Sequence, residues 1–240
     1  MKKILLSFVI ASAISACGNT SDITKSETIE TNAQVPPKNI IMIVGDGMGP
    51  AFTAAYRYFK DNPTTDAVEE TVFDRHLVGI ASTYPARVSG YVTDSAAGAT
   101  ALASGIKTYN GAIGMDEYKQ PHETVLERAK ERGLKTGVVV TSQINHATPA
   151  SYLAHNENRR NYNEIADSYV DDGIKADVLF GGGWKYFIRE DRNLVQEFEK
   201  KGFQYIDDYT SLASLSADKP ALGLFADIGL PWALDDPNKS

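Results

Sequence analysis

The sequence predicts an α/β fold in which helices cover both faces of a mainly parallel central sheet, a three-layer α/β/α sandwich. Short apolar runs of strand length alternate along the chain with stretches of helical pattern. Several of these runs are continuously apolar, which is typical of parallel strands buried on both faces. With 42% hydrophobic residues in 240, the chain can fill a core.

The elements follow in order along the chain. Strands are expected at the apolar runs 39–44, 77–84, 136–141, 177–180 and 203–206. Helices are expected at 95–105, 122–133, 149–158, 163–172 and 193–202. Gly105 stands where a glycine caps the end of the alanine-rich helix.

The N-terminus has the pattern of an export signal. Lys2 and Lys3 precede the apolar run Ile4–Ile14, which is too short for a bilayer span of about 20 residues. Small residues then lead to Cys17, the only cysteine, as in bacterial lipoprotein signals. We therefore interpret residues 1–16 as a signal peptide and 17–37 as a lipidated Cys17 with a flexible tether. The alternative is a plain signal peptide with a cysteine nearby by chance.

This interpretation predicts an exported protein, lipid-anchored to a bacterial membrane, in the periplasm or at the cell surface. The formal net charge of −7 has the wrong sign for holding nucleic-acid phosphates, so no nucleic acid binding is expected. Small phosphorylated ligands are not excluded, because metals and helix N-termini bind phosphate locally.

Polar residues follow the expected strands, where α/β sheets bind their ligands. Asp46 lies between two glycines after the first apolar run, and its carboxylate is a donor for a divalent metal or a helix cap. Ser95 opens the alanine-rich helix, where the helix dipole favours an anion, although serine is also a common N-cap. His146 and Thr148 follow a third strand, and Arg159 and Arg160 come after them. An arginine there could grip phosphate with two hydrogen bonds or be solvated.

Together these segments resemble the alkaline phosphatase family. The resemblance extends from about Lys38 to at least Phe180. The segments that carry it are Gly45–Gly49, Tyr91, Thr93–Ala97, Lys107–Gly111 and His146–Ala150.

The resemblance implies a phosphate monoesterase with two Zn²⁺ and one Mg²⁺. It makes Ser95 a nucleophile that becomes phosphoserine, binds substrate and contacts metal. Arg159 would hold the substrate phosphate and Asp94 would orient Arg159, whereas Arg160 would have no such role. Asp46 would bridge zinc and magnesium.

It also implies that Thr148 binds magnesium, with His146 beside that site as a ligand or a neighbour of a ligand. The full-length form would be a homodimer.

The sequence departs from the family in its metal ligands. Its histidines are His76, His122, His146 and His155, and none stands in the D-x-x-x-H or D-H arrangements with which the family holds zinc. We therefore expect residues 38–240 to be the N-terminal part of the catalytic domain, with little or no activity alone.

Several alternatives stay open at this point. The chain could be a non-catalytic lipoprotein fragment that binds phosphate or metal. Related metallo-hydrolases act on diesters or sulfate esters, although a bidentate Arg159 favours monoesters. A serine acyl-transferase is suggested by S-x-x-K at Ser104–Lys107 and K-T-G at Lys135–Gly137, but its S-D-N element is missing.

Overall fold

The computed structural model describes residues 37–235 and divides into two compact units, 1–44 and 45–240. In the first unit, residues 37–44 form neither helix nor strand. Ile40, Ile41 and Ile43 are 86%, 85% and 90% exposed. The strand predicted at 39–44 is therefore wrong for this structure, because a strand needs a hydrogen-bonded neighbour that an apolar run cannot supply alone. The predicted signal peptide and Cys17 lie outside the described residues.

The second unit is built on a parallel sheet. Its strands are β1 (Gly137–Gln143), β2 (Val178–Gly182), β3 (Gln204–Ile206) and β4 (Ala221–Leu224), in the order β1-β2-β4-β3. All three pairings are parallel. The predicted α/β class with a mainly parallel sheet is confirmed, as are the strands expected near 136–141, 177–180 and 203–206.

Two strand positions differ from the prediction. Residues 77–84 form no strand, and Val78 and Ile80 lie fully or largely exposed. β4 was not predicted, although Ala221–Leu224 is a short apolar run directly after Pro220 and all four of its residues are buried. Its place between β2 and β3 is set by pairing over a long stretch of chain, which no local pattern reports.

The described α-helices are short, and four of the eight follow an N-cap side chain that accepts a backbone hydrogen bond. They are α1 (Pro50–Lys60), α2 (Val72–His76), α3 (Ser95–Ser104), α4 (Val125–Glu131), α5 (Ala147–Ala150), α6 (Tyr162–Asp171), α7 (Trp184–Phe187) and α8 (Leu194–Lys200), with 3₁₀ turns η1 (Arg87–Ser89) and η2 (Tyr209–Ser214). Gly105 caps α3 with φ of 73°. Between residues 37 and 235, no helix has the length and apolarity to cross a membrane.

The helix predicted at 149–158 is mostly wrong. α5 ends at Ala150, and Ser151 Oγ donates back to the Ala147 carbonyl at 2.8 Å. Beyond a turn, the backbone of Asn156 pairs with Ile113 instead of continuing a helix. This pairing places the following residues beside the loop after α3, where part of the candidate site lies.

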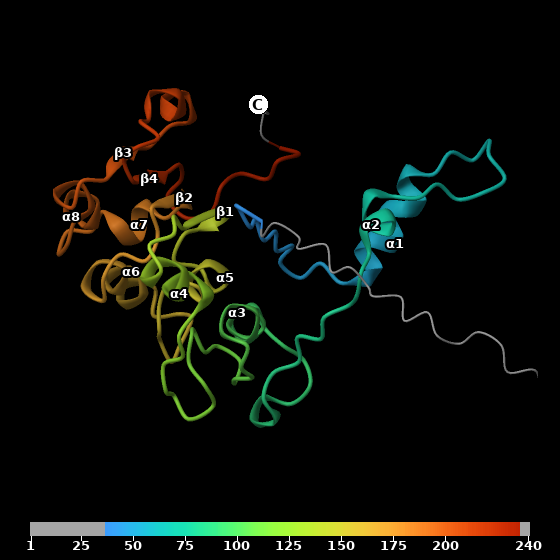
Figure 1. Ribbon diagram of the computed structural model, residues 1–240, viewed down its shortest axis with the longest axis horizontal. Coiled ribbons are helices and arrows are strands. Elements are labelled where there is room, and N and C mark those ends of the chain that lie inside the picture. Colours follow the sequence, from blue (N-terminus) through green and yellow to red (C-terminus); the bar gives the residue numbers. More distant parts are fainter. Residues whose placement is uncertain (1–36, 236–240) are drawn as a thin grey trace, which may run out of the picture. The chain divides into compact units, whose positions relative to one another are not determined.

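The core lies between one face of the sheet and the helices (Figure 1). Val138 and Val140 on β1 face it, whereas Val139 on the opposite face of β1 is 71% exposed. The largest fully buried core side chains are Phe187, Phe198, Ile113, Ile144, Ile165, Leu179, Leu194, Leu222 and Leu224. The buried helix faces thus fix the strand ends that carry the polar residues.

Phe198 tests how tightly this core is packed. Its ring is fully buried, with ring centroids 5.0 Å from Phe203 and 6.5 Å from Phe187. Phe198→Ala is expected to lower the free energy of unfolding by about 3–5 kcal/mol through lost burial and a residual cavity. Urea denaturation measures it, with the exposed Tyr118→Ala as a control expected to stay within about 0.5 kcal/mol. Equal effects of the two substitutions would contradict this packing.

Candidate active site

Ser95 is the first residue of α3, and the residue before it shapes the helix start. Asp94 is the N-cap, and its Oδ1 accepts a hydrogen bond from Ala97 N at 2.9 Å. Amide groups at a helix start lack intrahelical partners, and the dipole there is positive. Ser95 Oγ therefore lies beside a region that favours an anion, and the side chain is half-buried.

Asp46 brings the helix start together with a second segment. Its Oδ1 accepts a hydrogen bond from Ser95 Oγ at 3.0 Å, and its Oδ2 accepts one from Thr148 Oγ1 at 3.3 Å. Gly47 has φ of +70°, in the left-handed region, so the turn before α1 favours glycine there. Two hydroxyls that are widely separated in the sequence thus converge on one carboxylate.

The close approach of α3 and α5 explains this convergence. Ala96, Ala97, Ala99 and Ala103 of α3 are buried, and such small side chains let the two helices approach closely. Ser151, just after α5, contacts the carbonyl of Ala96 at 3.4 Å. The start of α5, with Thr148, is consequently held next to the start of α3.

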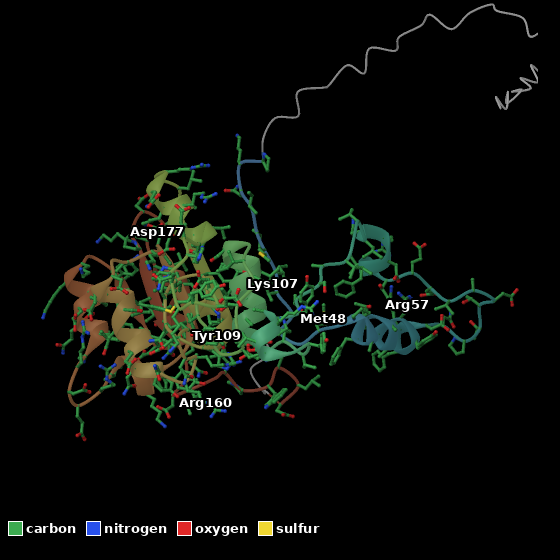
Figure 2. All side chains as sticks on the ribbon, turned by 90° about the horizontal axis from the view of Figure 1, so that it is seen from below. Met48, Arg57, Lys107, Tyr109, Arg160 and Asp177 are labelled. Atoms are coloured by element: carbon green, nitrogen blue, oxygen red, sulfur yellow. The ribbon has the colours of Figure 1, made fainter. Side chains whose placement is uncertain are left out.

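Arg159 lies between Asp94 and His146. Its Nη1 donates to Asp94 Oδ2 at 3.1 Å, and its Nη2 lies 3.3 Å from His146 Nε2. Burial lowers the pKa of His146, and the charge of Arg159 lowers it further, while Asp46 partly opposes both. A neutral ring that accepts at Nε2 fits this contact. Arg160 is exposed (Figure 2).

The sequence-predicted residues Asp46, Ser95 and Thr148 are brought into contact, and Asp94 and Arg159 form an ion pair. His146 lies against Arg159, and its role as a metal ligand stays a prediction.

Asn110 was not predicted as a functional residue, yet it supports the helix start. Its Oδ1 accepts from Asp94 N at 3.1 Å and its Nδ2 donates to Val92 O at 2.9 Å. Tyr109, labelled in Figure 2, donates from its hydroxyl to Glu157 O at 2.9 Å. Both residues belong to the segment Lys107–Gly111 that carries the family resemblance, which was the only signal available.

The acyl-transferase alternative is contradicted by the geometry. Lys107 Nζ donates to Ser82 O at 3.1 Å and lies 4.0 Å from the centroid of the Tyr84 ring. Ser104 Oγ instead lies 3.5 Å from His122 O, at the far end of α3 from Ser95. Because Ser104 and Lys107 engage different partners, they form no nucleophile and base pair.

The oxygen atoms gathered around Asp46 are suitable ligands for Mg²⁺. Two carboxylate oxygens and the hydroxyl oxygens of Ser95 and Thr148 are hard ligands of the kind that Mg²⁺ prefers. Zinc sites usually gather nitrogen or sulfur ligands, and the described part of the chain holds no cluster of three His, Cys, Asp or Glu side chains. The residues present therefore fit a partial magnesium site and do not by themselves make a zinc site.

The described site thus joins a serine at a helix start, a carboxylate that accepts from two hydroxyls and an ion-paired arginine, all on an α/β scaffold. Residues 37–240 match the family model of alkaline phosphatase, so the chain belongs to the alkaline phosphatase family. It is 48% identical to alkaline phosphatase 3 of Bacillus subtilis, over 97% of this chain and 52% of that protein. Alkaline phosphatase of Escherichia coli is 35% identical over 91% of this chain and 53% of its own length.

Solved structures agree. A cold-active alkaline phosphatase from a psychrophilic Shewanella aligns with a TM-score of 0.75 and 58% identity, over 81% of this chain and 47% of that chain. A variant of the TAB5 alkaline phosphatase aligns with a TM-score of 0.69 and 33% identity, over 80% and 54%, and is described with Mg bound in its M3 site. The chain thus spans about half the length of the relatives it matches.

Proposed function

We propose that the complete protein hydrolyses phosphate monoesters through a phosphoserine intermediate at Ser95. The observation that carries the proposal is the meeting of Ser95 Oγ and Thr148 Oγ1 on the two oxygens of Asp46, with the Asp94–Arg159 pair beside the same helix start. A nucleophile, a carboxylate for cations and a guanidinium for phosphate oxygens are the parts that phosphoryl transfer requires.

Each residue has a definable part in the transfer. The Ser95 hydroxyl donates to Asp46, which leaves oxygen lone pairs to attack phosphorus. A bond forms between Oγ and phosphorus while the bond from phosphorus to the ester oxygen breaks. The leaving alcohol takes up one proton to balance the one that the Ser95 hydroxyl loses. Water then cleaves the phosphoserine and releases inorganic phosphate. Two Zn²⁺ and one Mg²⁺, when bound, supply Lewis-acid stabilisation of the charge that develops on oxygen.

Arg159 would orient the phosphate. Its guanidinium is held by Asp94 on one nitrogen and by His146 on the other, so its remaining N–H groups are fixed in direction. A planar guanidinium donates two parallel hydrogen bonds to phosphate. The doubly ionised end of a monoester offers more oxygens to such a grip than a diester does.

The half-length match, the N-terminal pattern and the family resemblance each support a further proposal. We propose that the zinc ligands belong to the part of the family sequence with which this chain does not align. Residues 38–240 alone are then expected to turn over little or no substrate. Lipidation at Cys17, membrane anchoring after export and a homodimer belong to the same proposal. The competing hypothesis is a non-catalytic phosphate- or metal-binding lipoprotein, which predicts phosphate binding without turnover by the complete gene product.

Arg159 and Arg160 form a matched pair for testing the proposed role in phosphate binding. In the complete gene product, Arg159→Ala is expected to lower kcat/KM for an aryl phosphate monoester by about 10²–10³-fold, because two charge-assisted hydrogen bonds are lost. Arg160→Ala is expected to change it by less than about twofold, since exposed side chains away from the site contribute little. Initial-rate kinetics measure both, and equal losses would argue against the assignment.

A further inference from the structure

The turn that delivers Arg159 is tied to the loop after α3 by backbone hydrogen bonds. Ile113 and Asn156 exchange two of them, each 2.8 Å long, and Arg159 N donates to Gly111 O at 2.8 Å. The turn at residues 155–159 and the loop at 111–114 therefore run side by side. Any contact that holds one against the other also sets where the Arg159 side chain starts.

His155 makes such a contact with its side chain. Its Nδ1 lies 2.6 Å from Gly114 O, and its Nε2 lies 3.0 Å from Glu127 Oε1 on α4. The same Glu127 oxygen accepts from Lys175 Nζ at 2.7 Å, and Glu127 Oε2 accepts from Thr124 N at 2.8 Å. The side chains of His155, Glu127 and Lys175 are only 16%, 17% and 13% exposed. We call Gly114, Glu127, His155 and Lys175 the His155 clasp.

The His155 ring lies between a backbone carbonyl and a carboxylate. The Gly114 carbonyl can only accept, so Nδ1 must donate to it. Burial alone raises the pKa of Glu127, but hydrogen bonds from His155, Lys175 and Thr124 N together lower it well below its ordinary value. Glu127 is therefore an acceptor for Lys175 Nζ and Thr124 N, and its Oε1 also lies within hydrogen-bond distance of His155 Nε2. The ring thus bridges a loop carbonyl and a helix carboxylate.

Gly114 fits the clasp because it has no side chain. Its φ is +57°, and a Cβ at this position would lie 2.4 Å from Ala154 O and 2.7 Å from His155 Nδ1. The close approach of the two segments thus depends on glycine at 114. The contact is a built feature of the fold and not a chance meeting of surface groups.

We propose that His155 is a positioning residue for Arg159. The clasp holds the turn at 155–159 against the loop at 111–114, and so holds the guanidinium where Asp94 receives it. The inference rests on the proposed function in so far as Arg159 grips the substrate phosphate; the clasp itself is independent of that function.

The structural half of the proposal is tested without activity. In the complete gene product with ¹⁵N-labelled histidine, Nδ1 of His155 is expected to carry the hydrogen that Gly114 O accepts, and H155Q should remove this signal and assign it. In H155Q the Arg159 amide is expected to exchange its hydrogen about tenfold faster, as the tie to Gly114 is lost. A ring without a hydrogen on Nδ1, or unchanged exchange, overturns the clasp, even if the enzyme is fully active.

Two substitutions separate the bonds of the ring. Asn places an amide nitrogen near the position of Nδ1, whereas Gln places one near Nε2. H155N should therefore keep the Gly114 bond and much of the exchange protection, and H155Q should not. The control H122Q changes the side chain of another histidine that pairs with a carboxylate, Asp116. The backbone N of His122 donates to Gly114 O at 2.9 Å, and the substitution keeps that bond, so Arg159 exchange should stay unchanged.

The effect of His155 on phosphate binding by Arg159 is tested by measuring KM and kcat separately. Because Arg159 holds the phosphate in both the bound and the transition state, its displacement in H155Q should raise KM for a phosphate monoester about tenfold with little change in kcat. General loss of folded protein would lower the apparent kcat and leave KM unaltered. A rise in KM with rescue by H155N supports the proposal, and a fall in kcat alone overturns it. Absence of turnover by the unsubstituted protein would instead reject the proposed function and leave the clasp to the exchange data.

Discussion

Ser95→Ala is expected to lower the turnover of phosphate monoesters by the complete gene product by about 10³-fold or more, because it removes the attacking oxygen. Inorganic phosphate should still bind, since Arg159 and the start of α3 are retained. Steady-state kinetics measure the first effect and calorimetry with phosphate the second. The two together separate loss of chemistry from loss of the site.

The matched control is Ser104→Ala, at the other end of the same helix. Ser104 is also a helical serine with a weak contact to a carbonyl, but its Oγ lies with His122 O and not with Asp46. We expect its kcat to stay within about twofold of the unsubstituted protein. Comparable losses in the two variants would reject Ser95 as the nucleophile.

Asp46→Ala is the second substitution with a large expected effect. It removes the carboxylate shared by Ser95 and Thr148, so it deletes the only charged oxygen donor in that contact set. We expect Mg²⁺ affinity to fall by about 10²-fold or more and activity to fall with it. Loss of a residue that only supports a metal ligand already lowers affinity by about 10–100-fold, so loss of a charged ligand itself should cost at least as much. Metal titration followed by calorimetry and kinetics measures both quantities.

The exposed Asp66, in the connection between α1 and α2, serves as the control. Asp66→Ala removes the same charge without touching Ser95 or Thr148, so metal affinity should stay within about twofold. If Asp46→Ala bound Mg²⁺ as tightly as Asp66→Ala, Asp46 would not be a metal ligand and the proposed role would have to be abandoned.

The sequence predicted elements whose causes are local. β1 and β2 follow apolar runs, and α3 begins at Asp94–Ser95 and ends at Gly105, so patterns and caps were enough. The apolar runs 39–44 and 77–84 gave the same signal as β1 but form no strand. Whether an apolar run pairs depends on a distant segment, and hydrophobicity does not report that.

In the candidate site, too, some residues could be predicted from the sequence and others could not. Asp46, Ser95 and Thr148 were predicted because oxygen donors beside expected strand or helix ends pointed to metal and phosphate chemistry, and the family resemblance joined them. His155 and Asn110 were not predicted, because their partners lie far along the chain and their residue types occur as often on a surface. Only the folded structure shows that Asn110 holds the backbone of Asp94 and that His155 contacts Gly114 and Glu127.

A phosphoserine at Ser95 is the most direct test of the proposed reaction. The complete gene product, loaded with Zn²⁺ and Mg²⁺, would be mixed with a phosphate monoester, quenched in acid and digested for peptide mass spectrometry. We expect one added phosphoryl group on Ser95, and none in S95A. Turnover of the ester with an unmodified Ser95, or with the phosphoryl group on another residue, would contradict the assignment of Ser95 as the nucleophile.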